Sequence, residues 1–282
     1  MATKDSLSGI MTDLRGLAIS VAGVAQDAGV EALKGLGGHQ RSRPKGRFDV
    51  QIDADIDAEN AIVPRLKNLI PESEIASEET VAPIDWDKAN VWVVDPLDGT
   101  NNYYAAIPYL AISIALRRHH ELVLAVVHDP ILNHSYTACL GSGARRNGQE
   151  FDSPAPRPIE RATVSLITNY SSTGRRAGET LYLRLSSISR RVTTLWAPAA
   201  DLVRTATGHI DGIVCLQALY GDVCSGLLIL AESGGTILGP DGQHLDVAHL
   251  DPRAPVSFVA SKSYRLARDL WLALEPDLRT LM

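Results

Sequence analysis

The sequence contains little cysteine, and the few residues present are not spaced for a shared role. Cys139, Cys215 and Cys224 are the three cysteines, and no two of them form a C-x-x-C pair. An odd number without paired spacing argues against a secreted domain built on disulfides. We therefore expect buried thiols in a reduced, cytoplasmic protein.

Long apolar runs and basic runs are also absent. No apolar stretch reaches the roughly 18 residues that a membrane-spanning helix needs, so we expect no membrane association. The net charge is −6 and no Lys/Arg run stands out, so a nucleic-acid polymer is not an expected partner. The 282 residues, 45% of them hydrophobic, suffice for a large core in one domain or in two closely joined halves.

Hydrophobic periodicity predicts helices and strands that follow one another without a regular βαβ rhythm. This favours a layered α/β fold with mixed or antiparallel sheets rather than a barrel. A Pro-rich joint at 153–158 is the best candidate for a boundary between an N-terminal α+β subdomain, 1–155, and a C-terminal α/β subdomain, 156–282. The predicted helices are 5–34, 56–70, 178–187, 199–208 and 222–233, and the predicted strands are 90–94, 110–117, 121–128, 134–140, 162–168, 191–195 and 212–216.

The stretch VWVVDPLDGTNNYY, residues 91–104, ends an apolar strand with two carboxylates. Asp95 and Asp98 precede Gly99 and Thr100, and a glycine followed by small polar residues can present free backbone N–H groups to a phosphate. Carboxylates and phosphate repel each other unless a cation lies between them. Mg²⁺ suits this position because it is hard and binds carboxylates together with phosphate oxygens.

Other acidic residues can complete such a site, although each has a plainer interpretation. Glu78 precedes the strand, Asp55 belongs to an acidic run, and Asp222 is expected at the N-cap of a helix that starts at Val223. Taken alone, DPLDG is a common turn, Glu78 belongs to a solvated loop, and Asp222 is a helix cap. The combination favours a metal site.

The chain resembles the inositol monophosphatase family, within the larger group that includes the fructose-1,6-bisphosphatases. Three motifs agree in order and spacing. The acidic pair before the strand is Ser77-Glu78-Glu79, and the D-P-[IL]-D-G-T-x-N signature is matched by Asp95 to Asn102. A third segment runs from Gly221-Asp222 to Glu232-Ser233-Gly234-Gly235.

The resemblance implies an αβαβα sandwich, a homodimer, and two or three Mg²⁺ ions, with Mn²⁺ as a possible substitute and Li⁺ as an inhibitor. It assigns one metal to Glu78, Asp95 and the Leu97 carbonyl, and a second to Asp95, Asp98 and Asp222. Most of the implied metal ligands belong to subdomain 1–155, whereas Asp222 and the substrate pocket belong to 156–282.

The resemblance also implies catalytic roles. The backbone N–H groups of Gly99 and Thr100 would bind the phosphate. The Thr100 hydroxyl and Asp55 would orient the attacking water, with Asp55 at the outer side of the metal cluster. The implied catalytic set is therefore Glu78, Thr100, Asp55 and Asp95.

The sequence departs from the family on the substrate side. Trp196-Ala197-Pro198 stands where relatives carry G-S-A, Cys215 where inositol phosphatases place a Glu, and Gly221 where a Trp is usual. Trp196, Pro198 and Cys215 are thus the candidate substrate-binding residues. The pocket has either drifted or adapted to a different alcohol, and Trp196 either stacks on a substrate ring or packs in the core.

The expected activity is a Mg²⁺-dependent phosphomonoesterase that hydrolyses a small sugar, cyclitol or related alcohol phosphate by attack of a metal-activated water. The alternatives are a nucleotide 3′-phosphatase, a fructose-1,6-bisphosphatase, a histidinol-phosphatase, or a non-catalytic family member that binds or regulates. Arg175-Arg176 and Arg190-Arg191 either meet a second substrate phosphate or belong to the solvated surface.

Overall fold

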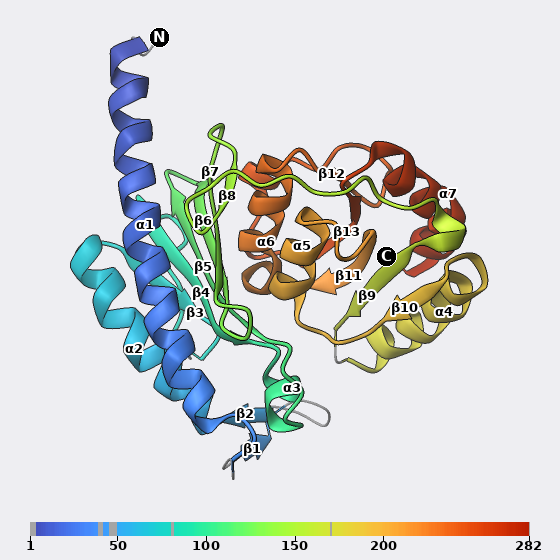
Figure 1. Cartoon of the computed structure of the whole chain (residues 1–282), viewed down its shortest axis with the longest axis horizontal. Helices are drawn as coiled ribbons and strands as arrows, with labels where there is room; N and C mark the ends of the chain where they lie inside the picture. The colour runs from blue at the N-terminus through green and yellow to red at the C-terminus, as the bar shows by residue number, and fades with distance from the viewer. Residues whose placement is uncertain (1–3, 39–41, 45–49, 80–81, 170, 282) are drawn as a thin grey trace.

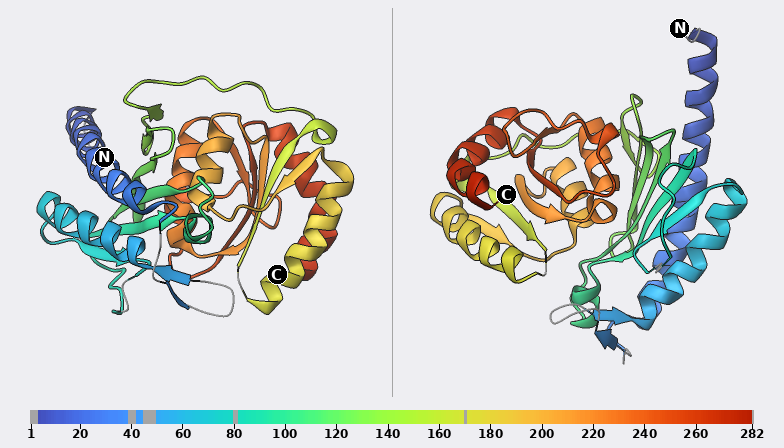
Figure 2. Two further views of the ribbon diagram at one scale, coloured as in Figure 1. Left: turned by 60° about the horizontal axis from the view of Figure 1, so that its bottom comes forward. Right: turned by 180° about the vertical axis from the view of Figure 1, so that it is seen from behind.

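The computed structural model describes residues 4–38, 42–44, 50–79, 82–169 and 171–281, and it places them in five layers (Figures 1 and 2). The helices are α1 (Lys4–Gly35), α2 (Asp53–Leu69), α3 (Thr100–Tyr104), α4 (Ser172–Ile188), α5 (Pro198–Ala206), α6 (Tyr220–Glu232) and α7 (Tyr264–Leu281), with short 3₁₀ turns η1 (Ile159–Arg161) and η2 (Val247–His249).

Two mixed sheets form the second and fourth layers. The first has the order β3-β4-β5-β6-β7-β8, and only its β3–β4 pair is parallel. The second has the order β10-β9-β11-β13-β12. The strand bounds are β1 (Ser42–Pro44), β2 (Val50–Ile52), β3 (Glu74–Ser77), β4 (Asn90–Asp98), β5 (Ala111–Arg118), β6 (Glu121–Asp129), β7 (His134–Cys139), β8 (Ala144–Arg146), β9 (Thr163–Thr168), β10 (Arg191–Thr193), β11 (Gly212–Ala218), β12 (Thr236–Leu238) and β13 (Val256–Ser261).

Three apolar clusters hold the layers together and confirm the αβαβα sandwich. In one, α1 and α2 cover the outer face of the six-stranded sheet. In another, α5 and α6 fill the space between the two sheets (Figure 1). In the last, α4 and α7 cover the outer face of the five-stranded sheet.

Local sequence accounts for several element ends. The β5–β6 hairpin turns at His119 and His120, whose φ values of 50° and 68° are those of a type I′ turn. Helix α6 ends in a Schellman motif, in which Gly235 N–H donates to Leu230 O and Gly234 N–H donates to Ala231 O. Gly234 has φ 83°, which favours glycine.

Some predicted bounds are wrong. Helix α6 begins at Tyr220 with Leu219 as its N-cap, so Asp222 lies in the first turn and is not the cap. Strand β4 continues through Asp98 instead of ending at residue 94, because the chain stays extended across a register shift between Asp95 and Asp98. Helix α7 and strands β3, β12 and β13 were not predicted.

The predicted joint at 153–158 lies between β8 and η1, and the second half of the chain anchors it. Asp211 accepts hydrogen bonds from Arg157 N–H, from the Arg157 guanidinium and from Thr163 N–H, at 2.8–3.0 Å. The division into subdomains 1–155 and 156–282 stays a prediction. None of the helices in the described part of the chain combines the length and apolar composition needed to cross a bilayer.

Candidate active site

A cavity of about 790 Å³ opens where β4 meets the N-terminal ends of α5 and α6. Its wall combines residues that are far apart in the sequence. All the predicted metal-binding and phosphate-binding residues line it: Glu78, Asp95, Leu97, Asp98, Gly99, Thr100 and Asp222. The fold therefore brings together the acids of three separate segments.

Each acid is placed by the end of a regular element. Glu78 directly follows β3, and its N–H donates to Val94 O at 3.1 Å, which keeps it beside β4. Asp95 and Asp98 lie at the end of β4 and are 4% and 2% exposed, whereas Asp222 is half-buried in the first turn of α6. Two nearly buried carboxylates so close in the sequence need either protons or a compensating positive charge.

The electrostatics show that these acids act on one another. Burial raises the pKa of Asp95 well above its usual range, and the charges of Glu78, Asp98 and Asp222 raise it further. Burial also raises the pKa of Asp98, with additional contributions from Asp201 and Asp222. The cavity thus gathers repelling negative charge.

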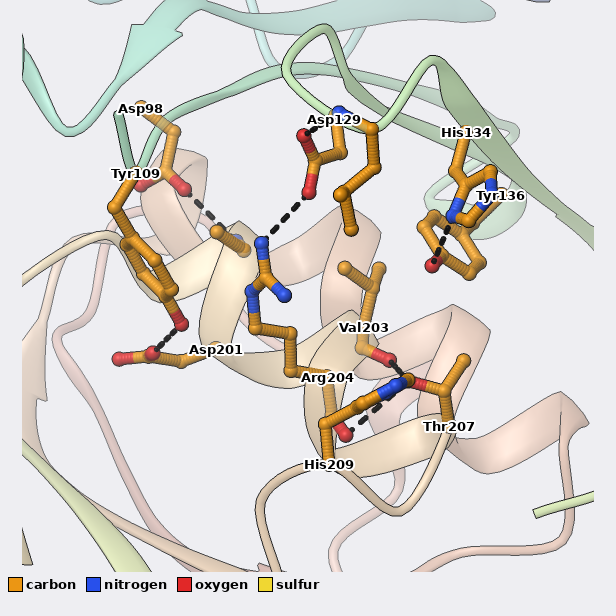
Figure 3. A network of polar contacts seen from close by, with 12 residues as sticks. Asp98, Tyr109, Asp129, His134, Tyr136, Asp201, Val203, Arg204, Thr207 and His209 are labelled. Atoms are coloured by element: carbon orange, nitrogen blue, oxygen red, sulfur yellow. Dashed lines mark hydrogen bonds and ion pairs between the residues drawn. The ribbon is translucent and has the colours of Figure 1, made fainter.

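Asp98 has two different oxygens. Oδ2 accepts a hydrogen bond from Ala200 N–H at 2.8 Å, and it caps the start of α5, whose own N-cap residue Ala197 provides no side-chain cap (Figure 3). Oδ1 is buried and has no hydrogen-bond partner. Oδ2 therefore stabilises the start of α5, and Oδ1 is available to bind a ligand.

Behind Asp98 lies a buried polar network that the sequence did not reveal (Figure 3). Asp201 is fully buried and accepts from the Tyr109 hydroxyl and, at 2.6 Å, from Ser165 Oγ; its burial raises its pKa to about 6. Arg204 lies 4.7 Å from the Tyr109 ring centroid and binds Asp129 at 2.8 Å. The only available signal was two charged residues within the largely apolar sequence of α5.

Asp55 lies outside the cavity lining but contacts it through Thr100. Its Oδ2 accepts from Ile52 N–H at 2.7 Å, and its Oδ1 accepts from the Thr100 hydroxyl at 3.0 Å. The Thr100 hydroxyl also lies 3.0 Å from Leu97 O. Burial raises the pKa of Asp55 to about 7, with smaller contributions from Glu79 and Glu78.

Gly99 sits where a side chain cannot be accommodated. It is the N-cap of α3 with φ 96°, and a Cβ atom there would lie 2.9 Å from Tyr109 O. A residue with a side chain would have to displace the backbone at 109. Glycine is thus required for the turn that carries the chain from the acids of β4 into α3.

The structure separates the three predicted substrate-binding residues. Trp196 and Pro198 line the cavity, and Trp196 does so with φ 50°, an unusual value for a bulky residue. Cys215 is 0% exposed in the core between the sheets and is not among the described residues that line the cavity, so we leave it out of the pocket. Gln217, within the β11 irregularity between Cys215 and Ala218 and with φ 55°, lines the cavity instead.

The donor set fits a hard divalent cation. Within the described ranges, no three His, Cys, Asp or Glu side chains converge closely enough to enclose an ion. The described lining residues that could bind a metal carry oxygen donors and include no His or Cys, and Asp98 Oδ1 lacks any other partner. Oxygen donors of this kind suit Mg²⁺ better than a soft metal.

Comparison with known proteins gives a consistent result. The family model described as "Inositol monophosphatase family" matches residues 14–272. An inositol-1-monophosphatase from Rhizobium meliloti is 32% identical over 199 residues, covering 70% of this chain and 75% of the relative. The Nus factor SuhB of Salmonella typhimurium is 29% identical over 205 residues, covering 71% and 75%. The crystal structure of SuhB from Bartonella henselae superposes with a TM-score of 0.82 at 25% identity and covers 92% of this chain and 98% of that one.

The fold and cavity thus define a five-layered α/β protein with an acid-lined cavity. The chain belongs to the inositol monophosphatase family, as the sequence motifs indicated.

Proposed function

We propose that this protein is a Mg²⁺-dependent phosphomonoesterase that hydrolyses a small sugar, cyclitol or related alcohol phosphate. One observation carries the proposal: Glu78, Asp95, Asp98 and Asp222, from three distant segments, line the same cavity as Gly99 and Thr100. Four acids around one cavity are unfavourable unless a cation is bound there. A cation beside backbone N–H groups creates a site for a phosphate ester.

The acids would hold the cation, with Leu97 providing its carbonyl. When bound, Mg²⁺ neutralises phosphoryl oxygens and lowers the pKa of water, and Mn²⁺ can replace it. Water forms the new bond to phosphorus as the bond from phosphorus to the alcohol oxygen breaks. The alcohol leaves with a proton taken from water, and inorganic phosphate remains.

Thr100 and Asp55 would orient the attacking water. Asp55 Oδ1 accepts the Thr100 hydroxyl proton at 3.0 Å, so the lone pairs of that hydroxyl remain available to accept a hydrogen bond from water. The backbone at Gly99 and Thr100 would hold the phosphate in line with that water. Positioning of this kind supplies a large part of catalysis in phosphoryl transfer.

The proposal is tested by phosphate release over a panel of sugar, cyclitol, nucleotide and amino-alcohol phosphates, with and without Mg²⁺. Asp95→Asn keeps an acceptor for Leu97 N–H, which lies 3.1 Å from Asp95 Oδ1, and so retains the local fold. We expect this variant to lose turnover by at least about a hundredfold. We also expect Mg²⁺ to raise the melting temperature of the wild type but not of the variant.

Asp269→Asn, an exposed acid on α7, is the matched control and should behave as wild type. Near-normal turnover by Asp95→Asn would remove Asp95 from the site. The rival function is a binding or regulatory protein, because several curated relatives are named Nus factor SuhB. If the whole panel gives no Mg²⁺-dependent phosphate release, this rival is favoured.

A further inference from the structure

Beside its acids, the cavity has an aromatic wall. Trp86, from the loop before β4, and Tyr220, the first residue of α6, both line the cavity. Their ring centroids are 6.1 Å apart, and the ring planes meet at 89°, an edge-to-face pair. Tyr220 is almost fully buried and Trp86 is half-buried, so the pair presents part of its surface to the cavity.

A buried arginine supports this wall from behind. The Arg117 guanidinium lies 5.9 Å from the Trp86 ring centroid and 5.5 Å from that of Tyr220. It is itself fixed by two carbonyl groups, His120 O at 2.8 Å and Leu250 O at 3.3 Å. Cation–π contacts at a nearly buried site hold the two rings in place, so the wall is preformed.

Arg253 lines the same cavity as this wall. It is the only Arg, Lys or His among the described residues that line the cavity. Its ion pairs are long, 3.5 Å to Asp87 and 4.0 Å to Asp251, and its side chain is 55% exposed. Because Asp87 directly follows Trp86, the ion pair places the guanidinium near the loop that carries Trp86.

Asp87 and Asp251 would compete only weakly with a substrate anion for the Arg253 guanidinium. Exposed ion pairs of this length contribute little, so a better-placed anion can take the place of Asp87. Arginine binds a carboxylate or phosphate through two parallel N–H donors. Elsewhere among the described lining residues, no side chain carries a positive charge that could bind a second anion.

We propose that Trp86, Tyr220 and Arg253 form a subsite for the alcohol half of the substrate, and that this subsite selects an alcohol carrying both an unsaturated ring and a second anionic group. The inference rests on the proposed phosphatase activity and extends its substrates beyond sugars and cyclitols to this class of alcohol. The ring lies against the aromatic wall, and the second anion exchanges with Asp87 at the guanidinium of Arg253.

Four phosphate esters test the unsaturated ring and the second anionic group separately. Glycerol 2-phosphate has neither feature, phenyl phosphate has the ring, 2-phosphoglycerate has the second anion, and 4-carboxyphenyl phosphate has both. We expect kcat/KM to be highest for 4-carboxyphenyl phosphate. Arg253→Gln should lower kcat/KM about tenfold for the two carboxylated esters, mainly through KM, and leave the other two unchanged. Trp86→Leu should lower it about threefold for the two aryl esters.

Two further variants provide controls. Asp87→Asn removes the competing acid and should lower KM for the carboxylated esters only. Arg265→Gln, on α7 with a side chain 90% exposed, removes a surface arginine away from the cavity and should change nothing. The subsite proposal is wrong if Arg253→Gln lowers kcat/KM equally for all four esters. It is also wrong if the wild type has equal KM for carboxylated and plain esters.

A binding measurement separates this inference from the proposed function. Calorimetry with phenylphosphonate and 4-carboxyphenylphosphonate, which are not hydrolysed, should show tighter binding of the carboxylated compound to the wild type and equal binding to Arg253→Gln. If no ester is hydrolysed, the phosphatase proposal fails and the calorimetry still decides the subsite. If esters are hydrolysed but the phosphonates bind equally, only the subsite fails.

Discussion

The buried carboxyl group of Asp55 makes the stability of the metal-free protein depend on pH. Asp55 is 1% exposed, and its pKa rises from an ordinary 3.8 to about 7, chiefly through burial. A raised pKa in the folded state means that folding binds a proton. The contribution of Asp55 to stability is therefore greatest below pH 4 and falls as the pH rises towards 7, with little further loss above that.

The size of this effect follows from the same values. A gap of about 3 pH units at 1.36 kcal/mol per unit amounts to about 4 kcal/mol, which is an upper bound at pH 8. Asp55→Asn abolishes the effect without orphaning a partner. Its amide oxygen can accept from Ile52 N–H, and its NH₂ can donate to the Thr100 hydroxyl, which then donates to Leu97 O.

Urea unfolding of the metal-free protein between pH 5 and 8 tests the reasoning. We expect Asp55→Asn to be more stable than the wild type by several kcal/mol at pH 8, and the difference to shrink steadily toward pH 5. Asp95 and Asp98 contribute slopes of the same sign to both proteins, so they cancel in the difference. Parallel pH profiles for the two proteins would show that Asp55 carries no raised pKa.

Two other substitutions test the supports of the site. Gly99→Ala should destabilise the protein by about 1–3 kcal/mol in thermal unfolding and sharply reduce turnover, because its Cβ would lie 2.9 Å from Tyr109 O at φ 96°. Its control is Gly16→Ala in α1, where a Cβ meets nothing within 4 Å, and this variant should be neutral or stabilising in the same measurement. Glu232→Ala should cost about 1–2 kcal/mol in chemical denaturation without loss of turnover, because Glu232 accepts two N–H bonds at 2.7–2.8 Å from the 141–143 turn; an unchanged unfolding midpoint would refute this.

The parts of the site that depend on local sequence were predictable. The apolar run before Asp-Pro-Leu-Asp-Gly indicated a strand with acids near its end, and Asp95 and Asp98 do lie in the last residues of β4, although the strand ends four residues later than predicted. The αβαβα order and the position of Asp222 at the same cavity came from the family motifs, because periodicity alone does not show which helix ends meet. Even so, the start of α6 was misplaced, since Tyr220 and Gly221 give no capping signal.

The remainder depends on tertiary contacts and on one backbone irregularity. Asp98 caps α5 from another element, so no spacing within α5 could reveal it. Counting back from Asp222 indicated Cys215, but β11 changes register after that residue and Gln217 lines the cavity instead. Arg253 follows Pro252 in a loop near the end of the chain, and its sequence context does not indicate a contact with the loop that carries Trp86.

The dual use of Asp98 links the remodelled pocket wall to the acids. Helix α5 begins at Pro198, two residues after Trp196, and Ala200 N–H in its first turn donates to Asp98 Oδ2. A change of the wall that moves the start of α5 also moves the carboxylate, and with it the unpartnered Oδ1. Because the same carboxylate caps α5 and belongs to the proposed cation site, we expect a change at the start of α5 to alter both substrate choice and cation affinity. On this reasoning, Trp196-Ala197-Pro198 in place of G-S-A would affect the acids as well as the pocket wall.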